Sequence, residues 1–316
     1  MTTHKILVSD GLAEDGLALL RSAGEVTLDP KISAAELLAV IPEYHALVVR
    51  SRTKVTAQVV QAGKHLEVIG RAGVGVDNID VAAALAQGIT VVNSPLAASV
   101  AVAEHTLGLM LALARMIPAA DASLKQGHWE KSAFMGSELS GKTLGLIGIG
   151  RIGALVAERA IAFGMSVLAY DPYLTPAQIR ERRAEPATFD EVLARSDTIS
   201  LHLPLTRETQ KLIGSAQIAQ MKKGARLIGA ARGGVIDEDA LRAALDAGAL
   251  AGAALDVFAF EPPPPDGIAA HPKVIATPHV GAQTLEAQAR AGLSIAEEVI
   301  AVLHGKEPRW TVMADE

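Results

Sequence analysis

The stretch KTLGLIGIGRIG at residues 142–153 decides the fold of the second half of this chain. An apolar strand is expected over residues 143–147, and it leads into the pattern G-x-G-x-x-G, formed by Gly148, Gly150 and Gly153. The alanine-rich sequence that follows predicts a helix. Strand, glycine turn and helix in this order are typical of a dinucleotide-binding unit, in which the helix N-terminus binds a pyrophosphate.

Each glycine has its own physical role. Gly148 permits the tight turn, Gly150 lets the backbone approach a pyrophosphate, and Gly153 lets helix and strand pack closely. A second apolar strand at 166–170 then leads to Asp171, where a carboxylate can accept hydrogen bonds from the ribose hydroxyls of an adenosine. Glycine-rich turns also occur for structural reasons alone, but strand, helix, strand and acid in register favour a dinucleotide site.

Composition excludes several other classes of protein. The chain has 316 residues, half of them apolar, which is enough for about two domains. A net charge of −6 argues against a nucleic-acid-binding surface. There is no cysteine, and no histidine spacing typical of a metal-dependent hydrolase, so no metal site is expected.

The apolar segments do not suggest a membrane protein. A membrane span needs about 18 uninterrupted apolar residues, and the richest segment, 97–114, is broken by Glu104 and His105. The N-terminus enters a predicted strand at once and lacks the features of a signal peptide. We therefore expect a cytoplasmic protein that binds neither membrane nor nucleic acid.

Strand-like and helix-like patterns alternate along the whole chain, which predicts an α/β fold with parallel sheets covered by helices on both faces. The strands form two sets. The first set is expected at residues 5–8, 25–28, 46–49, 67–69 and 89–92, and the second at 143–147, 166–170, 198–201, 226–229, 252–255 and 274–276. Long helices are expected over 98–115 and 284–304. The sequence thus predicts two doubly wound parallel-sheet domains.

Three residues have side chains suited to hydride transfer from a secondary alcohol, which needs a base for the hydroxyl proton and a cation for the substrate. His279 can exchange the proton, Glu261 can hold the other ring nitrogen, and Arg232 offers a planar fork to a carboxylate. Taken singly, each has a structural alternative: a salt-bridging arginine, a turn or a hydrogen-bonded histidine. All three follow predicted parallel strands, where ligands bind in open α/β sheets, so together they predict a catalytic site.

Several further stretches resemble the D-isomer-specific 2-hydroxyacid dehydrogenases. These are RAGVGVDNID (71–80), ARGGVIDE (231–238), ALDVF (254–258), EP (261–262) and TPHVGA (277–282), with the glycine turn between the first two. The resemblance spans nearly the whole chain and assigns the same catalytic roles to Arg232, Glu261 and His279. It implies that a Rossmann NAD-binding domain, residues 97–285, is inserted into a flavodoxin-like substrate-binding domain made of residues 1–96 and 286–316.

Two segments point to one branch of the family. VRSRTKVT (49–56) and FMGSELSGKT (134–143) look most like D-3-phosphoglycerate dehydrogenase. We expect a short form of this enzyme without a regulatory domain. This branch oxidises 3-phosphoglycerate to 3-phosphooxypyruvate in serine biosynthesis. The resemblance also implies a homodimer, in which the segment 118–140 reaches the partner.

The sequence departs from that branch at several positions, which leaves alternatives open. LAAS (96–99) stands where a Gly-Asn pair is usual, Lys131-Ser132-Ala133 replaces a more basic run, and Gln283 replaces a serine. Hydroxypyruvate, glyoxylate or another D-2-hydroxy acid or its keto form are therefore alternative substrates. An NAD-sensing binding protein or corepressor on the same fold is the alternative of another class.

The resemblance also implies ligand contacts. The expected cofactor-binding residues are Val74, Gly148, Gly150, Arg151, Ile152, Gly153, Asp171, His202, Leu203, Pro204, Ala230, Ala231, Arg232, Asp256, His279 and Gly281. The expected substrate-binding residues are Arg50, Arg71, Val74, Gly75 and Lys131. Asp256 would accept from the nicotinamide carboxamide. Asp171 repels a 2′-phosphate, which predicts NAD rather than NADP, and His105 is expected to be hydrogen-bonded rather than catalytic.

Overall fold

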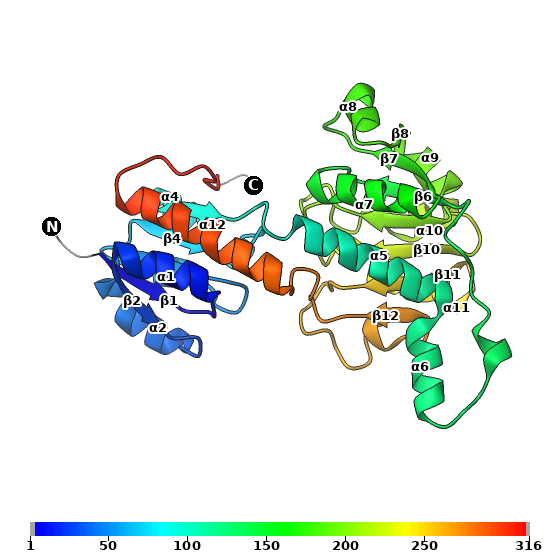
Figure 1. Cartoon of the computed structure of the whole chain (residues 1–316), viewed down its shortest axis with the longest axis horizontal. Helices are drawn as coiled ribbons and strands as arrows, with labels where there is room; N and C mark the ends of the chain where they lie inside the picture. The colour runs from blue at the N-terminus through cyan, green and yellow to red at the C-terminus, as the bar shows by residue number, and fades with distance from the viewer. Residues whose placement is uncertain (1–3, 314–316) are drawn as a thin grey trace. The chain divides into compact units, whose positions relative to one another are not determined.

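A computed structural model describes residues 4–313, which fold into two α/β units (Figure 1). Unit 1 consists of the residues up to Ser99 together with those from Ala282 on, and unit 2 is Val100–Gly281. Each unit contains one sheet whose paired strands are all parallel. The predicted α/β class with two parallel sheets is confirmed.

The sheet of unit 1 has the strand order β2-β1-β3-β4-β5, which is the flavodoxin-like arrangement. Its strands are β1 (Lys5–Val8), β2 (Glu25–Leu28), β3 (Ala46–Val49), β4 (Val68–Arg71) and β5 (Thr90–Asn93). Because the strands are parallel, the loops that follow β1, β3 and β4 emerge side by side at one edge of the sheet.

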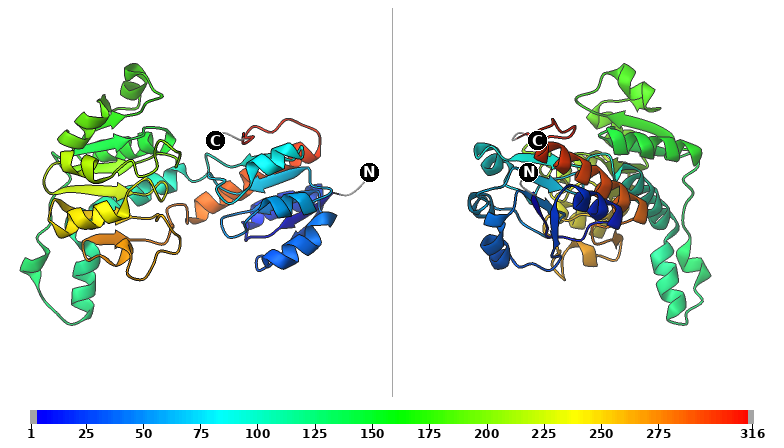
Figure 2. Two further views of the ribbon diagram at one scale, coloured as in Figure 1. Left: turned by 180° about the vertical axis from the view of Figure 1, so that it is seen from behind. Right: turned by 60° about the vertical axis from the view of Figure 1, so that its left-hand side comes forward.

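The two faces of this sheet are covered by different helices. They are α1 (Glu14–Ala23) and α12 (Leu285–Leu303) on one face, and α2 (Ala34–Val40), α3 (Ala57–Ala62) and α4 (Val81–Ala86) on the other, with the short 3-10 helix η1 (Ile41–Glu43) after α2. Ile6 and Val8 pack toward α1 and α12, whereas Leu7 packs toward α2 and α3. The blue α1 and the orange to red α12 lie side by side (Figures 1 and 2), and a Cβ on Gly16 would be 2.5 Å from the Gly292 carbonyl oxygen.

The sheet of unit 2 has the order β12-β11-β10-β9-β6-β7-β8. Its strands are β6 (Thr143–Ile147), β7 (Ser166–Tyr170), β8 (Glu185–Pro186), β9 (Thr198–Leu201), β10 (Ala225–Gly229), β11 (Leu250–Leu255) and β12 (Val274–Ala276). The chain builds outward from β6 to β8 and then returns to the other side of β6 with β9. This is the Rossmann order with one strand added, and it has a switch point between β6 and β9.

Helices cover both faces of this second sheet as well. They are α5 (Ser99–Arg115) and α7 (Arg151–Ala162) on one face, α9 (Phe189–Arg195), α10 (Ser215–Gln220) and α11 (Glu238–Asp246) on the other, and in addition α6 (Ile117–Lys125), α8 (Pro176–Glu181), η2 (Lys131–Phe134) and η3 (Ile268–Ala270). Met110 of α5 and Val156 of α7 share one core with Leu144 of β6.

None of the helices in residues 4–313 is by itself long and apolar enough to cross a membrane. Taken together, α5 and α6 have the length and composition of a span, but they are bent by 63° where they meet. The apolar side chains of α5 that include Leu107, Met110 and Ala114 are buried in the core of unit 2.

Candidate active site

The predicted site residues of unit 2 follow adjacent strands at one edge of the seven-stranded sheet. The glycine turn follows β6, Asp171 follows β7, and His202 follows β9. Arg232, Asp256 and His279 come after β10, β11 and β12, which are also neighbours. The carboxyl edge beside a switch point is the usual ligand site of an open α/β sheet, so the topology brings these loops to the expected place.

The glycine turn after β6 has the geometry of a phosphate site. Gly148 has φ +87°, and a Cβ there would lie 2.5 Å from the His202 carbonyl oxygen. A Cβ on Gly153 would lie 2.6 Å from the Gly148 carbonyl oxygen. Around Gly150, in contrast, a Cβ would meet nothing within 4 Å, and the N-terminus of α7 that follows has no side-chain cap. The backbone is therefore open at Gly150, at the N-terminus of a helix, which suits an anion.

Asp171 holds the glycine turn in place. Its Oδ2 accepts from the backbone N–H of Ile149 at 3.0 Å, and its Oδ1 accepts from that of Tyr173 at 3.0 Å. Each carboxylate oxygen has a second lone pair. Asp171 can therefore accept from ribose hydroxyls while it keeps the loops after β6 and β7 together.

His202 lies beside the glycine turn and is electrically neutral near pH 7. Its Nε2 is 3.0 Å from Ser200 Oγ, whereas its buried Nδ1 has no hydrogen-bond partner among the described residues. Burial lowers the pKa of His202 to about 4. An unpaired polar atom at this place fits a bound ligand. Leu203 is half-buried, and the exposed Pro204 accepts through its carbonyl from Thr209 Oγ1 at 2.7 Å.

His279 and Glu261 form a hydrogen-bonded pair, with 2.8 Å between Nδ1 and Oε2. The other oxygen of Glu261, Oε1, accepts from the backbone N–H of Phe258 at 3.2 Å, which fixes the carboxylate. Because a carboxylate only accepts, Nδ1 carries the hydrogen and Nε2 is left to exchange a proton with a ligand. Side-chain exposures of 49% for His279 and 38% for Glu261 leave the pair accessible.

Asp256 anchors the loop that carries His279. The carboxylate is almost fully buried and accepts from Thr277 Oγ1 at 2.6 Å, and from the backbone N–H groups of Val280 at 2.9 Å and Gly281 at 2.8 Å. His105 Nε2 lies 3.3 Å from it. Burial alone would raise the pKa of Asp256, but these hydrogen bonds outweigh it and hold the pKa below its ordinary value.

This anchor explains how the loop keeps an unusual backbone conformation. His279 has φ +51°, in the left-handed region that few residues other than glycine adopt. Such a residue costs about 1–3 kcal/mol and persists where the surroundings fix it. Here the bonds from Asp256 to both sides of His279 fix it. The sequence pointed to Asp256 as a carboxamide acceptor but not as the support of this loop, and Thr277 was missed. His105 is hydrogen-bonded to Thr277 Oγ1 at 3.2 Å, as expected.

Arg232 lies in a loop that packs tightly against the loop after β11. A Cβ on Gly233 would lie 1.8 Å from the Phe258 carbonyl oxygen, so only glycine fits at that position. Ala230 is buried and Ala231 is half-buried. Arg232 Nη1 donates to the Ala231 carbonyl at 2.8 Å, which folds the guanidinium back along its own loop.

The predicted substrate residues fall in both units. Arg50 follows β3, and Nη2 of its guanidinium lies 3.4 Å from Gln283 Oε1. Arg71 ends β4 and lies over the following turn, because a Cβ on Gly73 would be 1.4 Å from Arg71 Nη1. The carbonyl of Val74, which precedes Gly75, accepts from Asn93 Nδ2 at 2.7 Å. Lys131 belongs to unit 2, in the exposed helix η2.

The chain is similar to known proteins. The family model for the NAD binding domain of D-isomer specific 2-hydroxyacid dehydrogenases matches residues 107–281. The chain is 48% identical to a D-3-phosphoglycerate dehydrogenase of Archaeoglobus fulgidus over 98% of its own length and 59% of the relative. It is 52% identical to one of Methanocaldococcus jannaschii, over 96% and 58% respectively. The chain thus spans about three fifths of the length of these curated relatives.

Solved structures resemble the chain over its whole length. The TT0316 protein of Thermus thermophilus has a TM-score of 0.89 at 37% identity, covering 98% of this chain and 100% of that one. A glyoxylate reductase of Paecilomyes thermophila has a TM-score of 0.90 at 30% identity, with both chains fully covered.

Proposed function

Because the chain belongs to the D-isomer specific 2-hydroxyacid dehydrogenase family, whose NAD binding domain it contains, we propose that it is an NAD-dependent D-3-phosphoglycerate dehydrogenase. The proposed reaction oxidises the 2-hydroxyl of 3-phosphoglycerate and gives 3-phosphooxypyruvate. The observation that carries the proposal is the His279–Glu261 pair, with 2.8 Å between Nδ1 and Oε2, on a loop anchored by Asp256. The names of the relatives from Archaeoglobus fulgidus and Methanocaldococcus jannaschii support the choice of substrate.

In this proposal three residues of the chain handle the substrate. His279 Nε2 takes the hydroxyl proton on oxidation and returns it on reduction, while Glu261 holds Nδ1–H and stabilises the imidazolium. Arg232 binds the carboxylate or the α-keto oxygen through its planar fork. NAD, when bound, accepts the hydride from the carbon that bears the hydroxyl.

The cofactor is held by the loops at the switch point. The backbone N–H groups of Arg151 and Ile152 would bind the pyrophosphate in the open space at Gly150, and Asp171 would bind the adenosine ribose. Asp171 favours NAD over NADP, because its carboxylate repels a 2′-phosphate. Asp256 keeps one oxygen, Oδ2, with a single observed donor, which leaves a lone pair for the nicotinamide carboxamide.

Cationic side chains and backbone N–H groups are proposed to bind the substrate. We assign the phosphate to Arg50, Arg71 and Lys131, and the carboxylate to the backbone N–H groups of Val74 and Gly75. Burial lowers the pKa of Arg50, and the charge of Asp10 opposes this effect. An arginine guanidinium can form bidentate, charge-assisted hydrogen bonds with a phosphate.

We also propose that the protein forms a homodimer through the segment 118–140. None of the residues of α6 is buried, and Leu124 is 57% exposed. Farther along, Trp129 and Met135 are 84% and 85% exposed. Large apolar side chains of this kind are typical of interfaces.

The test is the rate of NAD reduction with D-3-phosphoglycerate, measured beside NADH oxidation with hydroxypyruvate and with glyoxylate. Efficient turnover of phosphoglycerate is the expected result. Turnover of the unphosphorylated keto acids alone would replace the proposal with a hydroxypyruvate or glyoxylate reductase, an alternative supported by the similarity to the glyoxylate reductase. Binding of NAD without turnover of any of the three would instead support a cofactor-sensing protein.

A further inference from the structure

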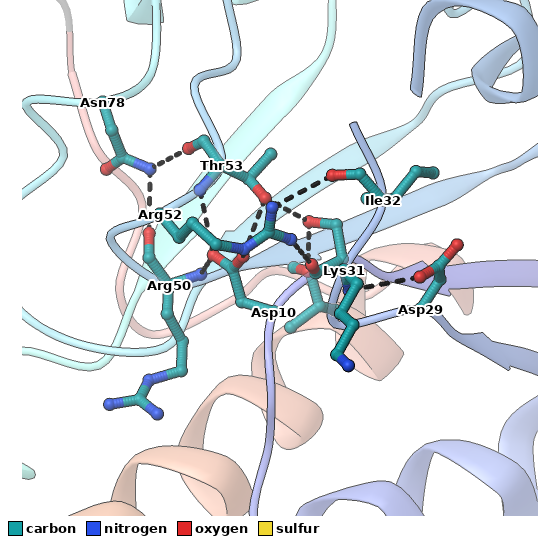
Figure 3. Close-up of polar contacts among 10 residues, drawn as sticks. Asp10, Asp29, Lys31, Ile32, Arg50, Arg52, Thr53 and Asn78 are labelled. Carbon is teal, nitrogen blue, oxygen red and sulfur yellow. Dashed lines mark hydrogen bonds and ion pairs between the residues drawn. The ribbon is translucent and has the colours of Figure 1, made fainter. Parts of the chain in front are cut away.

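A buried carboxylate organises the loop that carries Arg50. Asp10 follows β1 and is 4% exposed. Its Oδ2 accepts from the backbone N–H of Arg50 at 2.6 Å and from that of Thr53 at 3.2 Å, and its Oδ1 accepts from Thr53 Oγ1 at 2.8 Å (Figure 3). One side chain from the end of β1 therefore fixes both ends of the loop after β3.

Asn78 holds the same loop through its carbonyl groups. Its Nδ2 donates to the Arg50 carbonyl at 2.8 Å and to the Thr53 carbonyl at 2.7 Å, and Asn78 is 8% exposed. The N–H and C=O groups of Arg50 and Thr53 are thus bound by two side chains that come from other loops. These hydrogen bonds hold the segment at both of its ends, Arg50 and Thr53.

The side chains of the two arginines of this loop, Arg50 and Arg52, point in different directions, although they are only two positions apart. Arg52 turns inward: its Nε pairs with Asp10 Oδ1 at 3.0 Å, its Nη1 donates to the Ile32 carbonyl at 3.0 Å, and its Nη2 donates to the Ser9 carbonyl. Arg50 points out of the cluster (Figure 3). The guanidinium of Arg52 is therefore engaged within the loop. The guanidinium of Arg50 has a 3.4 Å contact from Nη2 to Gln283 Oε1 and keeps further N–H donors for a ligand.

We propose that Asp10 is a positioning residue that aims the Arg50 guanidinium at the phosphate of the substrate. The inference rests on the proposed function, in which Arg50 binds that phosphate. Asp10 does not touch the ligand; it acts through the backbone N–H of Arg50 and through Arg52. A charge-assisted bond depends steeply on geometry, so a loosened loop weakens phosphate binding without altering the chemistry at the hydroxyl carbon.

The experiment compares two keto acids that differ only in the phosphate, 3-phosphooxypyruvate and hydroxypyruvate, in NADH-dependent reduction. Asp10→Asn removes the charge but keeps the shape. We expect the KM for phosphooxypyruvate to rise about tenfold, with kcat nearly unchanged and with both constants for hydroxypyruvate within about twofold. Asp29→Asn is the matched control, because Asp29 bonds to the nearby Lys31 N–H at 3.2 Å and to none of the loop residues in Figure 3.

A double-mutant cycle separates positioning from general stability. In an Arg50→Ala background, Asp10→Asn should add less than about twofold to the KM for phosphooxypyruvate, because the group it positions is gone. A full additional tenfold loss in that background, or equal losses for both keto acids, would overturn the inference. Thr53→Val tests the same positioning role if the Asp10→Asn variant does not fold. It removes the Oγ1 bond to Asp10 and should raise the same KM about threefold.

The cycle also distinguishes this inference from the proposed function. If Arg50→Ala impairs phosphooxypyruvate selectively while Asp10→Asn does not, the phosphate assignment stands and the role of Asp10 is wrong. If Arg50→Ala leaves both keto acids unaffected, the assignment of Arg50 fails and the positioning role fails with it.

Discussion

Replacing Asp256 with asparagine should lower kcat, because Asp256 anchors the loop that carries His279. The carboxylate accepts on both oxygens, with Thr277 Oγ1 and the Val280 N–H on Oδ1 and the Gly281 N–H on Oδ2. Asparagine has one accepting oxygen, and its NH2 group would face at least one of these donors. The loop is left with an unpaired buried N–H, which costs about 1–3 kcal/mol.

That cost is comparable with the strain at His279, whose left-handed backbone is worth about 1–3 kcal/mol. The loop would therefore spend much of its time relaxed, with His279 displaced. Since 1.4 kcal/mol corresponds to a factor of ten, we expect kcat to fall about ten- to hundredfold. The assay is steady-state reduction of 3-phosphooxypyruvate at saturating NADH, so that a change in cofactor binding does not enter kcat.

Thr277 provides the matched pair of controls. Thr277→Ser keeps the hydroxyl that donates to Asp256 and should retain kcat, whereas Thr277→Val removes it and should lower kcat by up to about tenfold. An Asp256→Asn variant with kcat within twofold of the parent would refute the idea that this carboxylate holds the loop that carries His279 in a productive position.

Three further substitutions test the site. His279→Ala should lower the chemical rate by about 10²–10⁴-fold while NAD affinity stays nearly intact; near-normal turnover would remove His279 from the mechanism. Asp171→Ala should shrink the preference for NAD over NADP at least about tenfold in kcat/KM, and an unchanged preference would contradict the ribose assignment. Because the pKa of His202 is about 4 in the folded protein and about 6.5 in the unfolded chain, only the unfolded chain binds a proton between these pH values. The free energy of unfolding should therefore fall by about 3 kcal/mol as the pH drops from 6.5 to 4. Urea unfolding at pH 7 and pH 5 should show a smaller change in the free energy of unfolding for His202→Asn than for the parent. An equal change in both proteins would mean that burial does not lower the pKa of His202.

The sequence predicted the parts of the fold that depend on local patterns. The strand that the sequence predicts at 143–147 is β6 (Thr143–Ile147). The long apolar helix that it predicts at 98–115 is α5 (Ser99–Arg115). Both predictions are correct because apolar periodicity and the conformational freedom of glycine depend on only a few neighbouring residues.

The supporting contacts could not be predicted in this way. His105 meets Thr277 across 172 positions, and Asp10 meets Thr53 across 43. Nothing in a local pattern distinguishes an aspartate that holds a loop from one that ends a strand. The family resemblance could select Arg50, but only the fold reveals that Arg52 turns inward to Asp10.

The chain enters and leaves unit 2 at one place. His105, near the start of the unit, and Gly281, at its end, both contact the Asp256 carboxylate, and a Cβ on Gly281 would lie 3.5 Å from Val102 Cγ2. A segment whose two ends meet can interrupt another domain as a single loop would, at little cost to the host's own fold. The carboxylate of Asp256 thus contacts both ends of unit 2 and also supports the loop that carries His279, so a change at this junction would also disturb His279.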